Sequence, residues 1–71
     1  MNTIPKAAYT AAIIGGVIVP FPRTAGHAIQ VIDACNIEIQ LLTGQPDSEL
    51  PIAAYRDTIS VLKAYFFDEE Q

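Results

Sequence analysis

The segment from Thr24 to Gly44 most constrains the fold, because its apolar residues recur with the period of an α-helix. At 100° per residue these apolar residues fall within about 40° of one line: Ala28, Ile32, Cys35, Ile39 and Leu42. Thr24 can cap the N-terminus with its hydroxyl, and Gly44 can take the left-handed conformation that ends a helix. The segment therefore predicts an amphipathic helix over residues 24–43.

A second helix is predicted over residues 48–67, after a loop whose composition is typical of a turn. Asp47 or Ser48 can cap it, and Pro51 falls in its first turn, where proline is tolerated. Its apolar stripe matches the first in length and period: Ile52, Tyr55, Ile59, Leu62 and Phe66. Two such helices joined by a short loop form an antiparallel helical hairpin whose stripes face each other.

The N-terminal part allows two interpretations. An alanine-rich run with Pro5 in its first turn favours a short helix over about residues 4–14, followed by an extended apolar linker over residues 16–22. The alternative is a β-hairpin across Gly15–Gly16 that packs on the two helices. The helix is preferred, because alanine is a poor strand former.

The chain has 71 residues, which is enough for only one domain, over residues 1–71. The patterns above predict that this domain is mainly α-helical. Hydrophobic residues make up 51% of it and charged residues only 17%, against usual values of about 45–50% and about 25%. A domain this small cannot bury so much apolar surface by itself. We therefore expect an intermolecular interface, with a homodimer as the expected form.

The charge pattern argues against nucleic acid as a partner. The net charge is −4, from eight acids and four bases, and the bases are scattered rather than grouped as phosphate binding requires. No apolar run reaches the length of about 18–20 residues that a membrane span needs.

Cysteine and histidine usage gives no sign of a reactive site. Cys35 is the single cysteine, so no intramolecular disulfide can form, and a reducing cytoplasm is the default location. Its place on the core stripe indicates a small buried hydrophobe rather than a nucleophile. His27 is the single histidine and lies eight residues from Cys35, too far for a shared metal site or a catalytic pair. We therefore expect no catalytic residue, no metal, no cofactor and no enzymatic activity.

Each predicted helix also carries apolar residues away from its core stripe, and these are the candidate protein-binding residues: Ile37, Leu41, Ala54, Val61 and Tyr65. They predict a non-enzymatic protein-binding module, such as a small adaptor, inhibitor or assembly factor, whose partner is another protein or a second copy. One alternative is a structural homo-oligomer with no other partner. Another is a peripheral membrane protein that uses residues 7–21, although few bases are present to attract anionic headgroups.

Overall fold

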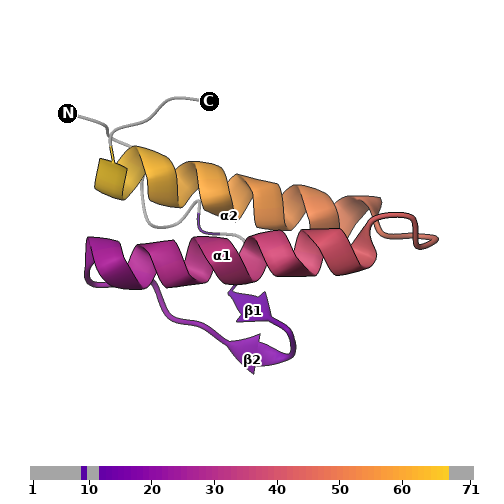
Figure 1. Cartoon of the computed structure of the whole chain (residues 1–71), viewed down its shortest axis with the longest axis horizontal. Coiled ribbons are helices and arrows are strands. Elements are labelled where there is room, and N and C mark those ends of the chain that lie inside the picture. The colour runs from indigo at the N-terminus through magenta and orange to yellow at the C-terminus, as the bar shows by residue number, and fades with distance from the viewer. Residues whose placement is uncertain (1–8, 10–11, 68–71) are drawn as a thin grey trace.

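The computed structural model describes Tyr9 and residues 12–67. The elements follow the order β1 (Ile13–Ile14), β2 (Val17–Ile18), α1 (Ala25–Leu42) and α2 (Glu49–Phe67). The two helices run antiparallel and side by side, and the two short strands form a hairpin beside α1 (Figure 1). The predicted mainly α-helical fold with an antiparallel helical hairpin is confirmed.

The signals that predicted the ends of α1 act as expected. The Thr24 hydroxyl accepts a hydrogen bond from the His27 N–H at 3.1 Å, which satisfies one of the N–H groups that a helix start leaves unpaired. After Leu42 the Thr43 N–H still donates to the Ile39 carbonyl, and Gly44 then takes a φ of 89°. Glycine adopts this angle without the clash that a Cβ would cause, so the chain can turn toward α2 there.

The helices pack through the two predicted stripes. Cys35 from α1 and Leu62 from α2 have no exposed surface, and Ala28 and Tyr55 are also buried. The other stripe residues are half-buried and packed around this core: Ile32, Ile39, Leu42, Ile59 and Phe66. Burying a large apolar side chain fully contributes about 1.5–3 kcal/mol, so the contact between the stripes is the main source of stability.

The structure shows the β-hairpin, and the helix predicted over about residues 4–14 does not extend over residues 12–14. Residues 4–8 and 10–11 lie outside the described part of the chain. Gly15 and Gly16 have φ values of 59° and 84°, and positive φ at both central residues is what a tight hairpin turn of this twist needs. The alanines that favoured a helix are not in the strands, which consist of the β-branched pairs Ile13–Ile14 and Val17–Ile18.

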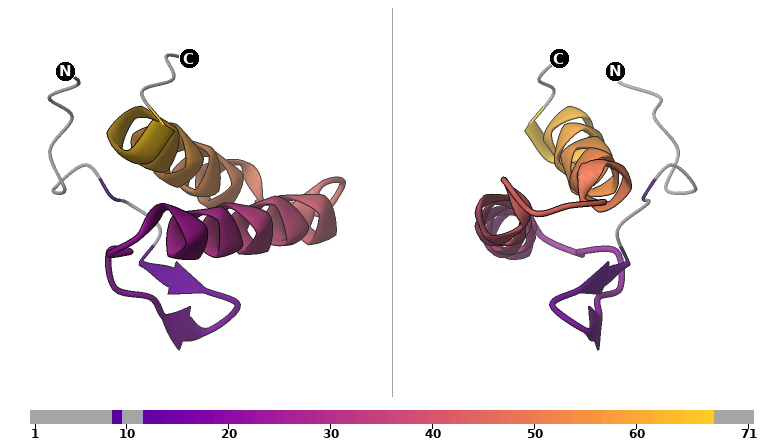
Figure 2. Two further views of the ribbon diagram at one scale, coloured as in Figure 1. Left: turned by 60° about the vertical axis from the view of Figure 1, so that its left-hand side comes forward. Right: turned by 90° about the vertical axis from the view of Figure 1, so that its right-hand side faces the viewer.

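The hairpin and the segment after it form a third layer against one side of the helix pair (Figure 2). Ile14 is buried in the core, and Val19 and Phe21 pack against it. The Tyr55 hydroxyl on α2 donates a hydrogen bond to the Ile13 carbonyl at 3.3 Å. This bond joins residues 42 positions apart and ties the hairpin to the far helix.

The core also includes residues that the predicted stripes do not contain. Val31 on α1 and Thr58, Val61 and Ala64 on α2 are buried, although none of them belongs to a predicted stripe. Ile32 and Ile59, which belong to the predicted stripes, stay partly exposed.

We expect Tyr55→Phe to lower the free energy of unfolding by about 1 kcal/mol, because it removes the bond to Ile13 and leaves that carbonyl without its donor. Urea unfolding measures this loss. Amide hydrogen exchange compared with the native chain should increase more in β1 and β2 than in the helices, which would place the effect at the hairpin.

Tyr9→Phe is the matched control, since the Tyr9 hydroxyl oxygen is buried with no hydrogen-bond partner. Removing an unsatisfied buried hydroxyl is expected to leave stability unchanged or raise it by up to about 1 kcal/mol. Equal destabilisation by both variants would contradict the role given to the Tyr55 bond.

Candidate interaction site

Large exposed apolar side chains gather on both faces of the hairpin and on the adjoining side of α1. More than half of the surface of each of these residues is exposed, and together we call them the apolar surface: Ile13, Val17, Ile18, Ile37 and Leu41. Ile13 and Ile18 are cross-strand partners, so their side chains share one face of the hairpin. Ile37 and Leu41 lie one helical turn apart on α1.

The two parts of this surface meet at Glu38. A Cβ added to Gly15, in the hairpin turn, would lie 3.4 Å from the Glu38 carboxylate oxygen Oε2. Glu38 follows Ile37 and precedes Leu41 by three positions, so the hairpin turn rests on the same stretch of α1 that presents these two residues. The hairpin lies directly alongside α1 in both views of Figure 2.

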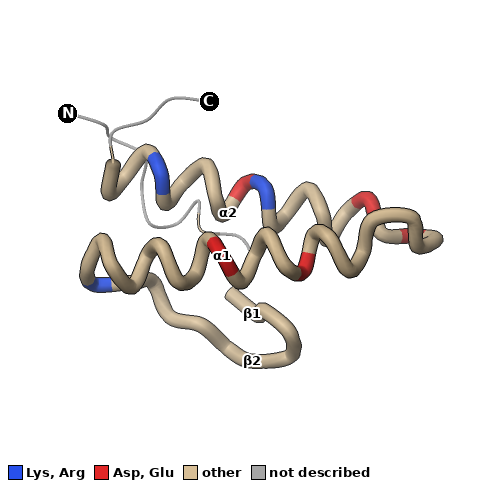
Figure 3. Tube along the Cα trace, in the orientation of Figure 1, with Lys and Arg blue, Asp and Glu red and all other residues tan. Residues whose placement is uncertain are grey.

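The hairpin half of the surface carries no charge. Residues 12–22 contain no acid or base, and Figure 3 shows the whole hairpin without a charged residue. Glu38 is the nearest acid that contacts the hairpin turn. An apolar area with no charge and one carboxylate at its edge is suited to contact another apolar surface rather than a polar ligand.

The structure places the predicted binding residues in three different environments. Ile37 and Leu41 are exposed on the apolar surface, as a binding role requires. Val61 is only 6% exposed, so it is not available to a partner in this conformation, and Ala54 is half-buried. Their positions off the predicted stripe suggested an outer face, whereas the fold buries Val61 fully and Ala54 in part.

Tyr65 lies at the other end of the helix pair from Leu41, because α1 and α2 are antiparallel. It is 46% exposed, and its ring makes edge-to-face contacts with Phe21 and Phe66, each with ring centroids 5.0 Å apart. An aromatic ring in such contacts adds about 0.5–1.5 kcal/mol beyond its burial. Tyr65 therefore has a role within the fold, and the structure does not bring it together with Ile37 and Leu41.

The hairpin residues Ile13, Val17 and Ile18 were not predicted as binding residues. Two features of the sequence identify them. The β-branched residues on both sides of two glycines predict a hairpin, and these strands lack the alternating polar residues that a hairpin with one solvent-exposed face usually has. Ile13 and Ile18 lie on the face opposite to the buried Ile14, and a two-stranded hairpin can bury only one face against the helices, so these two residues stay exposed. Val17 shares the face of Ile14 and is still 63% exposed.

Cys35 has the properties of a packed side chain and not of a nucleophile. Burial and, to a smaller extent, the nearby Glu38 carboxylate raise the pKa of its thiol from an ordinary value of 9.0 to about 11. At neutral pH the thiol keeps its proton, and a protonated thiol is a poor nucleophile and metal ligand. Burial also raises the pKa of Tyr9, with a smaller contribution from Cys35.

Among residues 9 and 12–67, no three acids, histidines or cysteines come together as metal ligands would. Neither helix within these residues is long and apolar enough to cross a membrane. In comparisons with known proteins, no family model, no curated protein and no solved structure matches this chain.

The raised pKa of Cys35 predicts a loss of stability in alkaline solution. The unfolded thiol ionises near pH 9.0 while the folded thiol keeps its proton to about pH 11, so ionisation favours the unfolded chain between these values. The contribution of this group is complete below pH 9 and declines as the pH rises toward 11. Urea unfolding of the native chain and of Cys35→Ala across this interval measures it.

The alanine variant is expected to be less stable at neutral pH, because it leaves a small cavity, but to lose less stability per pH unit above pH 9. An equal loss of unfolding free energy above pH 9 in the native chain and in the alanine variant would contradict the raised pKa of the Cys35 thiol. The native thiol should also react with iodoacetamide much more slowly than the thiol of the urea-unfolded chain.

Proposed function

We propose that this chain is a non-enzymatic protein-binding module, a small adaptor, inhibitor or assembly factor, that acts through the apolar surface. The observation that carries the proposal is the exposure of Ile13, Val17, Ile18, Ile37 and Leu41 on adjoining elements. Soluble monomers rarely leave large apolar side chains grouped in this way, and such groups are typical of protein contact sites. We propose a reducing compartment such as the cytoplasm as its location, since the single cysteine is buried and unpaired.

The hairpin is suited to contact a protein in two ways. Its outer face offers the β-branched side chains of Ile13 and Ile18, which are stiff and lose little rotamer freedom on binding. Strand β2 is also an edge of a two-stranded sheet within the described residues, so its outer edge has backbone groups that a partner strand could pair with, whereas the Ile13 carbonyl of β1 is bonded to Tyr55.

A structural homo-oligomer that uses this same surface is the second candidate. The observation that favours it is the absence of charge from residues 12–22 in a chain with a net charge of −4. Two copies of an uncharged face can meet without the repulsion that the rest of the acidic chain would cause.

Leu41→Asp is expected to abolish binding to the partner and to leave the fold intact. Leu41 is exposed, so an aspartate there costs little stability, but a carboxylate buried at an apolar interface without a partner costs several kcal/mol. Gln40→Asp is the matched control, because it adds the same charge at the next exposed position of α1 but points away from the hairpin. Affinity capture from the lysate of the source cells, quantified by mass spectrometry, compares the three proteins.

Val61→Asp tests the assignment of this residue to the interior. It is expected to unfold the chain, because it places a charge at a position only 6% exposed, and circular dichroism would show the loss of helix.

A partner that is retained by Leu41→Asp and Ile37→Asp would overturn the proposed site. Self-association lost in Leu41→Asp, with no other protein captured, would favour the homo-oligomer, and binding to neutral lipid vesicles lost in the same variant would assign the surface to membranes.

A further inference from the structure

A half-buried carboxylate lies where the two parts of the apolar surface meet. A Cβ on Gly15 would lie 3.4 Å from Oε2 and 3.9 Å from Cδ of Glu38, so this carboxyl group rests against the hairpin turn. At 100° per residue, Glu38 is about 60° round α1 from the exposed Leu41 and about 60° from the buried Cys35. It therefore occupies the boundary between the covered side of α1 and the side that carries Ile37 and Leu41.

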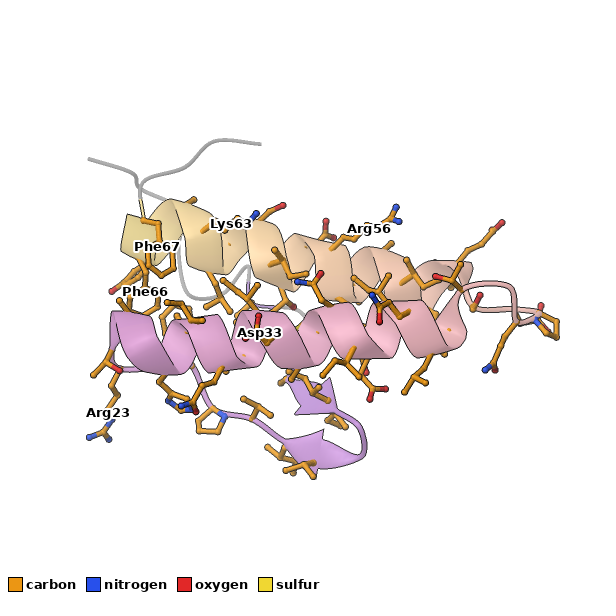
Figure 4. The ribbon with its side chains drawn as sticks, in the orientation of Figure 1. Arg23, Asp33, Arg56, Lys63, Phe66 and Phe67 are labelled. Carbon is orange, nitrogen blue, oxygen red and sulfur yellow. The ribbon has the colours of Figure 1, made fainter. Side chains whose placement is uncertain are left out.

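None of the bases in the described part of the chain pairs with Glu38. Residues 12–22 and helix α1 contain no lysine or arginine. The bases that the structure does describe lie elsewhere: Arg56 and Lys63 are on the edge of α2 away from the hairpin, and Arg23 just precedes α1 (Figure 4). Asp33, the other acid of α1, is exposed and keeps its water. Glu38 is thus the acid of α1 that is both half-buried and without an opposite charge among the described residues.

A partner that contacts both parts of the apolar surface has to cover Glu38. The turn of the hairpin meets α1 at this residue, and Leu41 lies one helical turn further along α1. On the other side, Val17 directly follows the turn and is 63% exposed, although it is on the hairpin face that carries the buried Ile14. The carboxylate therefore lies between Val17 and Leu41, and a segment that touches both of these side chains passes over it.

The charge of Glu38 restricts which partner can bind there. A wholly apolar partner would remove water from the carboxylate and supply nothing in its place, and this loss of hydration opposes binding. A basic side chain at the same place forms a charge-assisted hydrogen bond instead. We propose that the partner of the apolar surface is a protein segment that is apolar except for one lysine or arginine, and that this base pairs with Glu38. The inference rests on the proposed protein-binding function and specifies the chemistry of the partner.

A second copy of this chain does not supply that chemistry from the same surface. Its apolar surface would bring only uncharged side chains and a second Glu38, because residues 12–22 and α1 lack a base. Two half-buried carboxylates would then be covered without an opposite charge, and the net charge of −4 on each copy adds repulsion. The position of Glu38 therefore favours a different protein over the homo-oligomer as the occupant.

Selection from a random peptide library displayed on phage tests the inference with the native chain as bait. The selected peptides are synthesised, and fluorescence anisotropy measures their dissociation constants. They are expected to carry one lysine or arginine among apolar residues. Exchange of this base for an uncharged residue of similar length, citrulline for arginine or norleucine for lysine, is expected to weaken binding at least about tenfold.

Glu38→Gln removes the charge from the protein side and keeps the size of the side chain. This variant is expected to bind the base-containing peptide at least about tenfold more weakly than the native chain does. The two changes should not add, because both remove the same ion pair. The uncharged peptide is therefore expected to bind the native chain and Glu38→Gln about equally.

Two further variants serve as controls. Glu49→Gln removes an identical charge from an exposed position in the first turn of α2 and is expected to leave the affinity for the peptide unchanged. Leu41→Ser removes an exposed apolar contact without adding a charge and is expected to weaken binding, which shows that the peptide occupies the apolar surface. Circular dichroism of every variant shows whether the helices are retained.

Peptides that lose affinity in Leu41→Ser but not in Glu38→Gln overturn the inference and leave the proposed function standing. Selected peptides that bind the apolar surface without a base also overturn it, and so does an equal loss of affinity in Glu49→Gln and Glu38→Gln. A library that yields no peptide weakened by Leu41→Ser counts against both the apolar surface as a binding site and the role given to Glu38.

Discussion

The packing of α1 against α2 is the interaction on which the rest of the structure depends, and Cys35 of α1 and Leu62 of α2 lie in its core with no exposed surface. Neither helix is stable alone in water at this length, so each forms only because its stripe is buried by the other. The short loop between them, which turns at Gly44 with a φ of 89°, holds the stripes face to face. Burial at this contact also sets the chemistry of the one cysteine, since loss of water raises the pKa of the Cys35 thiol to about 11 and keeps it unreactive.

Two helices leave two open sides, and the chain covers only one of them. The hairpin layer enters the core through Ile14 and is held by the hydrogen bond from Tyr55 to Ile13. Because a two-stranded hairpin buries one face, its outer residues Ile13 and Ile18 remain exposed next to Ile37 and Leu41 on α1. The two helices also leave a hollow of about 270 Å³ between the start of α1 and the end of α2, lined by Ile29, Ile32, Lys63 and Phe67. The excess of apolar residues in this small chain thus stays partly exposed at more than one place on its surface.

Most of the fold could be predicted from the sequence, whereas the candidate site could be predicted only in part. Both helices, the Thr24 cap of α1 and the stripe residues follow from periodicity and local propensity, which depend on neighbours along the chain. The N-terminal segment was ambiguous because alanine favours a helix while the Gly15–Gly16 pair and the flanking β-branched residues favour a hairpin. Val61 looks like an outer position when α2 is considered alone, but it is only 6% exposed in the folded chain, because burial depends on contacts outside its own helix.

The sequence by itself determined the class of fold, the turn at Gly44, the absence of a disulfide within the chain and the surplus of apolar side chains. These properties depend on composition and on spacing along one element. Only the tertiary structure decided which flank of the helix pair the hairpin covers, and hence which apolar residues are buried and which are exposed. The physical reason is that a helix with apolar residues on more than one side can bury any of them, and the choice is made by contacts between residues far apart in the chain, such as Tyr55 with Ile13.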